Sequence, residues 1–276
     1  MNMSNLSSHA QEIYNSSRVV HSYKKVIKLL APETVIFDEL RVEFANKRIL
    51  DIGVGAGRTV PHLTAISARY VGIDFAECMV EQCRARFPAF DFHVCSVTDM
   101  RHFSDGAFDL VVFSFNGLDT QEHEERLRAL SEINRVLDKD GKFVFSSHNR
   151  NRAPIQKPWS LSRLPPLYDL KHPLSAVKRV AAYVLGTINY LRLVRRNEYT
   201  EGYEIIVDEG HNDYGMRGYH ITPDKQIAQL KQAGFETTGI VNNAGHRLGD
   251  AERVTDTSPW IYYVCRKEAR NSSIEM

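Results

Sequence analysis

The sequence predicts an α/β fold in which short strands, mostly parallel, alternate with amphipathic helices. Three observations support this. Short apolar runs alternate with stretches whose apolar residues recur every three or four positions. One run, 108–115, is largely apolar, as in strands that are buried on both faces. A glycine-rich turn at 53–57 links the first run to a helix-compatible stretch, and ligands bind at such turns in open α/β sheets.

Size and composition limit the possible classes of protein. The 276 residues are 43% hydrophobic and 25% charged, as is ordinary for a globular protein, and the net charge of +1 favours no particular partner. The four cysteines form no C-x-x-C pair, which indicates free thiols in a reducing compartment. The first ten residues lack the apolar core of a signal peptide, and no run is long enough to cross a membrane. We therefore expect a cytoplasmic protein without an integral membrane segment.

The first strand is predicted at 49–52 and runs into Gly53, Gly55 and Gly57. These glycines let a ligand approach the backbone closely, and the following helix offers free N–H groups. Arg58 stands where a dinucleotide-binding G-x-G-x-x-G turn needs its last glycine, which argues against a nicotinamide dehydrogenase. A second predicted strand, over 70–74, ends in an acid that can accept both hydroxyl groups of an adenosine ribose.

Together these segments resemble the class I S-adenosylmethionine-dependent methyltransferases. Asp51 through Gly57 matches the first motif of that family, and Asp74 matches its ribose-binding acid. The further matching segments are 96–100, 108–115 and 137–145. The resemblance covers 45–150 well and 219–267 more loosely.

The resemblance implies a Rossmann-like, seven-stranded, mostly parallel sheet with helices on both faces and an antiparallel last strand. It also implies S-adenosylmethionine as cofactor and S-adenosylhomocysteine as product. We expect a single catalytic domain with an N-terminal helical lid and an inserted cap. Its parts would be lid helices at 1–48, a cofactor-binding core at 49–149, a substrate cap at 150–218, the completion of the core at 219–268 and a tail at 269–276.

The N-terminal part is predicted as loose over 1–10, followed by helices at 12–30 and 33–44. Two interpretations remain open for the first helix. It folds over the methionine end of the cofactor, bringing Tyr14 and Arg18 to it and Tyr23 to the acceptor, or it only packs at the sheet edge.

Further cofactor contacts are expected after the second and third strands. Phe75 and Met79 directly follow Asp74 and could touch the adenine, although Met79 is better explained as core. The resemblance implies that Asp99, after a strand at 91–96, bonds the adenine amino group and that Met100 lends a backbone N–H.

The acceptor is expected at the carboxyl ends of the fourth and fifth strands. Phe115 would face the cofactor and Asn116 the acceptor. Asn116 is not followed by prolines as in many enzymes that methylate bases, so nucleic acid is a poor candidate. His148 ends a strand at 142–147 and is our candidate general base, with a purely structural role as the alternative.

The insertion carries opposite charges in its two parts. Residues 150–196 hold ten Lys or Arg and one acid, whereas 197–213 hold six acids and no Lys or Arg. A helix that starts at Pro173 has an apolar stripe formed by Val177, Val180, Val184, Ile188 and Leu191. Either 173–196 forms a basic amphipathic cap that attracts an anionic substrate or a membrane surface, or the two parts pair with each other.

A β-hairpin is predicted from 203–207 and 214–221, and its turn holds Glu209, His211 and Asp213. Nothing else supports metal binding there, so we expect no metal. Tyr219 and His220 are expected beside the acceptor by analogy with the family. A helix at 224–232 and antiparallel strands at 235–241 and 260–266 complete the core.

We therefore predict methyl transfer to an oxygen or nitrogen of a small metabolite, sugar or natural product. A tRNA or protein methyltransferase that docks through its basic insertion is one alternative. A non-catalytic module that binds S-adenosylmethionine is another. The sequence does not indicate an oligomeric state.

Overall fold

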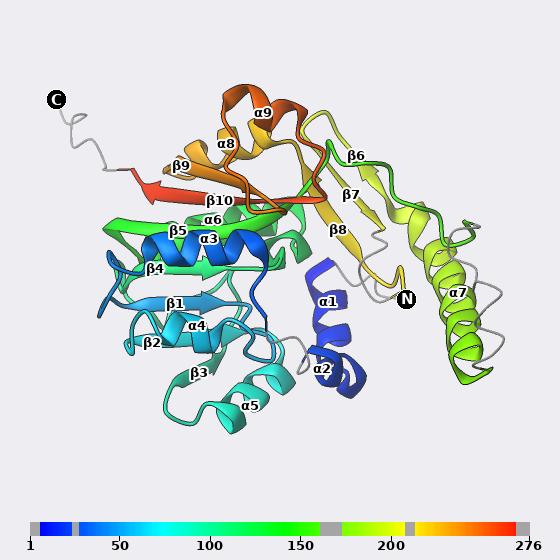
Figure 1. Ribbon diagram of the computed structural model, residues 1–276, viewed down its shortest axis with the longest axis horizontal. Coiled ribbons are helices and arrows are strands. Elements are labelled where there is room, and N and C mark those ends of the chain that lie inside the picture. The colour runs from blue at the N-terminus through cyan, green and yellow to red at the C-terminus, as the bar shows by residue number, and fades with distance from the viewer. Residues whose placement is uncertain (1–5, 24–27, 161–172, 208–212, 269–276) are drawn as a thin grey trace.

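A computed structural model describes residues 6–23, 28–160, 173–207 and 213–268, and within them one mixed sheet organises the chain (Figure 1). Seven strands follow the order β3-β2-β1-β4-β5-β10-β9. The first five are parallel, and β10 runs antiparallel to both of its neighbours. These seven strands are β1 (Ile49–Ile52), β2 (Tyr70–Asp74), β3 (Asp91–Val94), β4 (Phe108–Phe113), β5 (Leu137–Asn149), β9 (Phe235–Asn242) and β10 (Trp260–Lys267).

Helices cover both faces of this sheet. On one face α3, α4 and α5 contribute to an apolar cluster with β1 and β4, and on the other α6 and α8 do so with β4, β5 and β10. The predicted two-sided α/β architecture is confirmed. The helices are α1 (Leu6–Tyr14), α2 (Ser17–Tyr23), α3 (Ala31–Leu40), α4 (Val60–Thr64), α5 (Glu77–Arg86), α6 (His123–Val136), α7 (Pro173–Leu193), α8 (Pro223–Gln232) and α9 (Asp250–Thr255), with short 3₁₀ turns η1 (Gly117–Thr120) and η4 (Val194–Arg196).

The sheet has ten strands in the described residues, not seven, because the insertion adds β6 (Glu198–Tyr199), β7 (Tyr203–Val207) and β8 (Arg217–Ile221). The pairing of β4 with β5 ends at Phe145, and the last two residues of the longer β5 pair in parallel with β8. The expected hairpin is present as β7 and β8. Its second strand begins at Arg217 rather than 214.

The N-terminal helices differ from the expectation. Residues 6–10 were expected to be loose, but they belong to α1, in which Leu6 and Ala10 are buried. The single helix expected over 12–30 is broken after Tyr14, and α2 follows at Ser17. Residues 24–27 lie outside the described part. None of the described helices combines the length and the apolar character needed to cross a bilayer.

Candidate functional site

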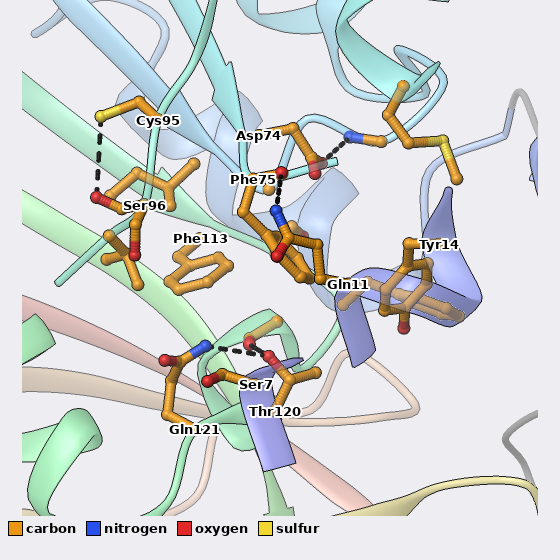
Figure 2. A pocket seen from close by; sticks show the side chains of 18 of the residues that line it. Ser7, Gln11, Tyr14, Asp74, Phe75, Cys95, Ser96, Phe113, Thr120 and Gln121 are labelled. Carbon is orange, nitrogen blue, oxygen red and sulfur yellow. Dashed lines mark hydrogen bonds between the residues drawn. The ribbon is translucent and has the colours of Figure 1, made fainter. Parts of the chain in front are cut away.

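A pocket lies at the carboxyl ends of β1, β2 and β4, where the N-terminal helices cover the sheet (Figure 2). Asp74 and Phe75 line one side, and Thr120 and Gln121 line the other, with the Phe113 ring between them in the view. The pocket therefore spans from the second strand to the turn that follows the fourth. This is the edge at which open α/β sheets bind ligands.

Asp74 is the buried acid of the pocket. Its side chain accepts the backbone N–H groups of Gly55 and Ala76, each at 2.9 Å, and the residue is only 5% exposed. Burial raises the pKa of Asp74 to about 6, although these backbone N–H groups oppose the rise. A carboxylate has about four acceptor positions, so two backbone bonds leave capacity for a ligand.

The glycine turn brings bare backbone to the same pocket. Gly53 and Gly55 line it with φ of +64° and +54°, values that favour glycine. A Cβ on Gly53 would lie 2.8 Å from the Phe113 ring. Gly57, also expected to bind cofactor, does not line the pocket, because its backbone packs against Phe87, which directly follows α5.

Replacing Gly53 by alanine is therefore expected to disturb the pocket. The new Cβ would require a strained backbone and would push the Phe113 ring, which lines the pocket. We expect a loss of about 1–3 kcal/mol in the free energy of unfolding and at least about a tenfold loss of S-adenosylmethionine affinity. Thermal melting and titration calorimetry measure both, and Gly202→Ala, where a Cβ meets nothing within 4 Å, is the matched control.

The N-terminal helices form one wall of the pocket. Tyr14 and Tyr23 line it, and their rings meet edge to face with centroids 5.8 Å apart. Gln11 donates its side-chain N–H to the Phe75 carbonyl at 2.8 Å (Figure 2). Tyr14 and Tyr23 thus border the pocket, and a lid over the cofactor stays a prediction. Arg18 belongs to α2, but its side chain lies outside the described part of the structure.

The start of α1 is fastened to segments far away in sequence. The Leu6 N–H donates to Glu122 at 3.0 Å, and the His9 ring lies 2.8 Å from the Gly215 carbonyl. Leu6 also packs with Ile205 and Tyr219 of the hairpin. The helix α1 therefore bridges the start of α6 and the inserted hairpin.

The turn after β4 supplies the other side of the pocket. Phe115 and Asn116 have φ of +57° and +59°, which is rare for non-glycine residues and marks a strained turn. Phe115 lines the pocket and is 42% exposed, whereas Asn116 is buried and does not line it. This backbone conformation directs the Phe115 ring toward the pocket. The turn η1 begins directly after Asn116.

A buried ion pair supports this turn from below. Glu33, which is fully buried at the start of α3, pairs with Arg58, and the hydroxyls of Ser114 and Tyr262 also donate to its carboxylate. Burial alone would raise the pKa of Glu33, but Arg58 and Ser114 hold it below its usual value. The Arg58 guanidinium also lies over the Phe115 ring at 5.4 Å. Arg58, which stands in place of the last glycine of a dinucleotide-binding turn, is thus held by its ion pair with Glu33.

Asp51 is placed in the core rather than in the pocket. One of its carboxylate oxygens accepts the Thr59 hydroxyl at 2.6 Å and the Tyr70 hydroxyl at 2.8 Å. The side chain is 1% exposed, and burial raises its pKa to about 6. Asp51, expected to contact the cofactor, does not line the pocket: it ties β1 to β2 and to the start of α4, which fixes the glycine turn between them.

Asp99 and Met100, expected to contact the adenine, do not line the pocket either. Asp99 is half exposed and paired with Arg101, and Met100 is fully buried with its N–H donated to Glu132 at 2.9 Å. Because β3 ends at Val94, the residues that reach the pocket are Cys95, Ser96 and Val97. Met79, in contrast, lines the pocket although it is 1% exposed.

His148 is tied to a buried network instead of lining the pocket. Its Nδ1 lies 2.8 Å from Asp119, which also accepts the His148 backbone N–H at 2.6 Å and pairs with Arg126 at 2.6 Å. Tyr219 and His220, expected beside the acceptor, are both fully buried outside the pocket lining. Tyr219 stacks with Tyr203 and His123, and His220 lies beside His148. The packing of β8 against the end of β5 accounts for the burial of both.

Several lining residues were missed by the sequence reasoning. They are Ser7, Ser8, Gln11, Ser96, Val97, Thr120 and Gln121. The spacing of Leu6, Ala10 and Ile13 is helical and could have indicated α1. No local sequence signal marks Thr120 and Gln121, because it is the strained turn at Phe115 and Asn116 that places them in the pocket lining.

The ionisable side chains that line the pocket among the described residues are those of Tyr14, Tyr23, Asp74 and Cys95. Burial raises the pKa of Tyr23 above its usual value and that of Cys95 to about 11, so both are neutral near pH 7. No group of metal-ligating side chains occurs in the described part of the chain, and Glu209 and His211 lie outside it. The pocket is therefore equipped for binding and orientation, not for acid–base chemistry by a histidine.

The sequence comparison decides the family. A family model for a methyltransferase domain matches residues 49–141, which include the glycine turn, Asp74 and the turn after β4. These residues form a methyltransferase domain. Within this methyltransferase domain, S-adenosylmethionine is the cofactor to which the Asp74 carboxylate and the bare glycine backbone are suited.

Curated relatives of the methyltransferase domain extend the comparison. A demethylmenaquinone methyltransferase from Clavibacter sepedonicus is 35% identical over 114 residues, covering 40% of this chain and 45% of that protein. A ubiquinone biosynthesis O-methyltransferase from Xanthomonas oryzae is 27% identical over 135 residues, covering 47% of this chain and 55% of that protein. The chain spans about half the length of the curated relatives it matches.

Solved methyltransferase structures share the fold across nearly the whole chain. One is the Burkholderia thailandensis 1,6-didemethyltoxoflavin-N1-methyltransferase with its substrate and S-adenosylhomocysteine bound. It has a TM-score of 0.56 and 15% identity, and the match covers 96% of this chain and 88% of that one. A methyltransferase from Thermotoga maritima has a TM-score of 0.55 and 14% identity, with 94% and 99% covered. At these identities the likeness establishes the fold only.

Proposed function

We propose that the protein transfers the methyl group of S-adenosylmethionine to an oxygen or nitrogen of a small-molecule acceptor. The observation that carries this proposal is one pocket that joins the buried Asp74 and two bare glycines to a polar far side at Thr120 and Gln121. The far side is covered by the lid, so an acceptor there is shielded from water. Shielding and orientation are the main requirements of in-line methyl transfer.

The chain would hold the cofactor through three kinds of contact. Asp74 accepts the ribose hydroxyls, and Gly53 and Gly55 allow the methionine part to approach the backbone. Phe75 and Val97 provide apolar surface for the adenine. When bound, S-adenosylmethionine supplies a methyl group on a positively charged sulfur, which is already activated for transfer.

The acceptor would lie between the Phe115 ring and the lid. The pocket would hold the nucleophilic oxygen or nitrogen of the acceptor facing the place of the transferable methyl group. The acceptor would give up its proton to solvent, because no histidine among the described residues lines the pocket. Ser7, Ser8 and Gln121 offer hydroxyl and amide groups that can orient a polar acceptor, while Phe113 and Phe115 provide apolar contact.

The relatives support an organic acceptor of modest size. Their names place them in menaquinone and ubiquinone biosynthesis, and they include both carbon- and oxygen-methylating enzymes. The N1-methyltransferase among the similar structures has a small heterocycle bound. The choice of oxygen or nitrogen rests on the hydroxyl and amide groups of Ser7, Ser8 and Gln121 in the pocket lining.

Two measurements test this function. Titration calorimetry with S-adenosylmethionine should show binding, and mass spectrometry should show that members of a panel of phenols, amines and heterocycles gain one methyl group. Absence of cofactor binding would contradict the proposal. Cofactor binding without turnover of any compound in the panel would favour the non-catalytic module instead.

His148 is expected to support the structure rather than to remove a proton. His148→Gln should therefore keep turnover within about tenfold of wild type, because the reacting groups meet in a pocket that this residue does not line. Steady-state kinetics over a range of pH provides the readout. A fall of more than about a hundredfold in kcat with unchanged cofactor affinity would restore the general-base role.

A further inference from the structure

The helix α7 of the insertion is held to the rest of the molecule along one face only. Tyr190 is 6% exposed and packs with Val207 and Tyr214. A Cβ on Gly186 would lie 3.1 Å from the Tyr214 ring, and Asn189 donates to the Asp213 carbonyl at 3.0 Å. Figure 1 shows α7 at the edge of the molecule, beyond the strands β6 to β8 and away from the main sheet. One side of the helix is therefore anchored and the other faces outward.

The outward side of α7 is an apolar stripe. Its members recur at three- and four-residue intervals, so they lie on one face. The stripe residues have exposed fractions of 66% for Val177, 50% for Val180 and Val184, 42% for Ile188 and 56% for Leu191, and Leu185 beside them is 39% exposed. All of these except Leu191 line a shallow groove. Together these residues are half of the large exposed hydrophobic residues of the described chain, gathered on one helix. Scattered apolar residues need no explanation, but a contiguous patch marks an interaction surface.

Positive charge accompanies the stripe. Residues 173–196 contain five Lys or Arg and no acid, in a chain whose net charge is +1. Arg192 follows Ile188 by four residues, so it lies at the edge of the same face, and Arg195 and Arg196 follow the end of the helix. All three of these arginines are exposed. A partner of α7 must therefore bury the aliphatic side chains of the stripe and carry negative charge next to the surrounding arginines.

The apolar stripe and the positive charge together indicate which partner binds to α7. A second copy of the chain would bring two sets of like charges together around the stripe. An anionic lipid surface accepts both features at once, because the apolar side chains enter the boundary between headgroups and acyl chains while long basic side chains reach the headgroups. The helix does not have the length and hydropathy of a membrane-spanning segment, which agrees with a helix that lies flat.

We propose that the α7 stripe docks the protein on an anionic membrane surface. Co-sedimentation of the full chain with vesicles tests this, using phosphatidylcholine alone and phosphatidylcholine mixed with phosphatidylglycerol. We expect binding to the mixed vesicles that weakens at least about tenfold when salt is raised, because exposed charges are screened. Binding to the neutral vesicles should be at least about tenfold weaker.

The variant V180D/V184D should lose at least about tenfold of the vesicle affinity, because two carboxylates would enter the apolar boundary. The matched control is V254D, which places one carboxylate on a residue of α9 that is also 50% exposed. It should bind vesicles like the wild type. Both substitutions are on exposed positions, and circular dichroism checks that the variants remain folded.

Three results would overturn the proposal. The first is no vesicle binding by the wild type, and the second is equal binding to neutral and mixed vesicles. The third is a dimer in sedimentation equilibrium that V180D/V184D dissolves, since the stripe would then be an interface between copies. Methyl transfer is not measured in any of these experiments, so their outcome is independent of the proposed function.

Discussion

Asp74→Asn should lower the affinity for S-adenosylmethionine by at least about a hundredfold, which corresponds to about 2.7 kcal/mol. Hydrogen bonds to a charged group contribute about 1.5–3 kcal/mol each, and the carboxylate is placed to accept two hydroxyl groups of a ribose. The amide oxygen of the variant still accepts one backbone N–H, so the glycine turn should remain in place. Titration calorimetry measures the loss.

Asp99→Asn is the matched control for this experiment. Asp99 follows the next strand and was the other acid expected to contact the adenosine, but it is ion-paired with Arg101 outside the pocket. The control should bind the cofactor like the wild type. Loss of affinity in Asp99→Asn but not in Asp74→Asn would contradict our placement of the cofactor.

The pH dependence of the affinity for S-adenosylmethionine gives an independent test of the role of Asp74. Because the pKa of Asp74 is about 6, its carboxylate becomes protonated below that pH and loses acceptor capacity. Wild-type affinity should therefore fall towards tenfold per pH unit below about pH 6, while Asp74→Asn should lack this contribution. Measurement of the dissociation constant between pH 5 and 8, in the same buffer series for both proteins, decides the point.

The stability of Asp74→Asn shows whether its loss of cofactor affinity comes from a lost contact or from a disturbed fold. The folded-state pKa of Asp74 lies above its unfolded value, so its contribution to stability is fully present below about pH 4 and is lost as pH rises through about 6. At pH 7 the buried carboxylate is therefore a cost to the native state. Asp74→Asn should be at least as stable as the wild type there, and a lower melting temperature would mean that the side chain has a structural role as well.

The sequence was sufficient for those features of the site that depend on local pattern. Gly53, Gly55 and Asp74 follow apolar runs in a spacing that only a strand–turn–helix unit explains, and the structure places all three in the pocket. Tyr14 and Tyr23 also reach the pocket, although the helix expected around them is broken.

Other features depend on contacts between distant segments. Asp51 occupies a motif position, but Thr59 and Tyr70 bind its carboxylate in the core. Asp99 was preferred over Ser96 because it is an acid, yet the end of β3 at Val94 decides which residues reach the pocket. Strand ends are set by pairing with neighbours, which a single sequence does not reveal.

The N-terminal lid shows the same limitation more strongly. Residues 6–10 are mostly small and polar, and only Leu6 has a large apolar side chain. Their helix is held by Glu122 and by Gly215, which lie more than a hundred residues away. Tertiary contacts of this kind override weak local propensity. The result is that α1, the segment before α6 and the inserted hairpin form one connected structure.

Arg126→Met should have the largest effect on stability. Arg126 is fully buried in α6 and donates to Asp119 at 2.6 Å, to Gln226 at 2.6 Å and to Ser147 at 3.0 Å. Its loss would leave the buried Asp119 carboxylate without its arginine partner. Breaking one partner of a buried ion pair costs about 3–5 kcal/mol, so we expect a loss of that size in the free energy of unfolding at pH 7.

Denaturant unfolding measures this loss, and Arg128→Met is the matched control. Arg128 lies on the same helix with an exposed side chain, so its replacement should change stability by no more than about 0.5 kcal/mol. The double variant Asp119→Asn/Arg126→Met should be more stable than Arg126→Met alone, because the uncompensated charge is removed. A double variant that is less stable than Arg126→Met would contradict the electrostatic explanation.

The cost of Arg126→Met should also depend on pH in a definite direction. Burial alone would raise the pKa of Asp119, but Arg126 and His148 hold it below its usual value, so in the wild type its contribution to stability is present at neutral pH and lost in acid. Without Arg126 the buried carboxyl should bind a proton more readily than in the unfolded chain, and the variant then gains stability from Asp119 as pH falls. The difference between the two proteins should therefore shrink from pH 7 towards pH 4. A difference that stays constant over this range would mean that lost packing around the Arg126 side chain, rather than the bare Asp119 charge, destabilises the variant.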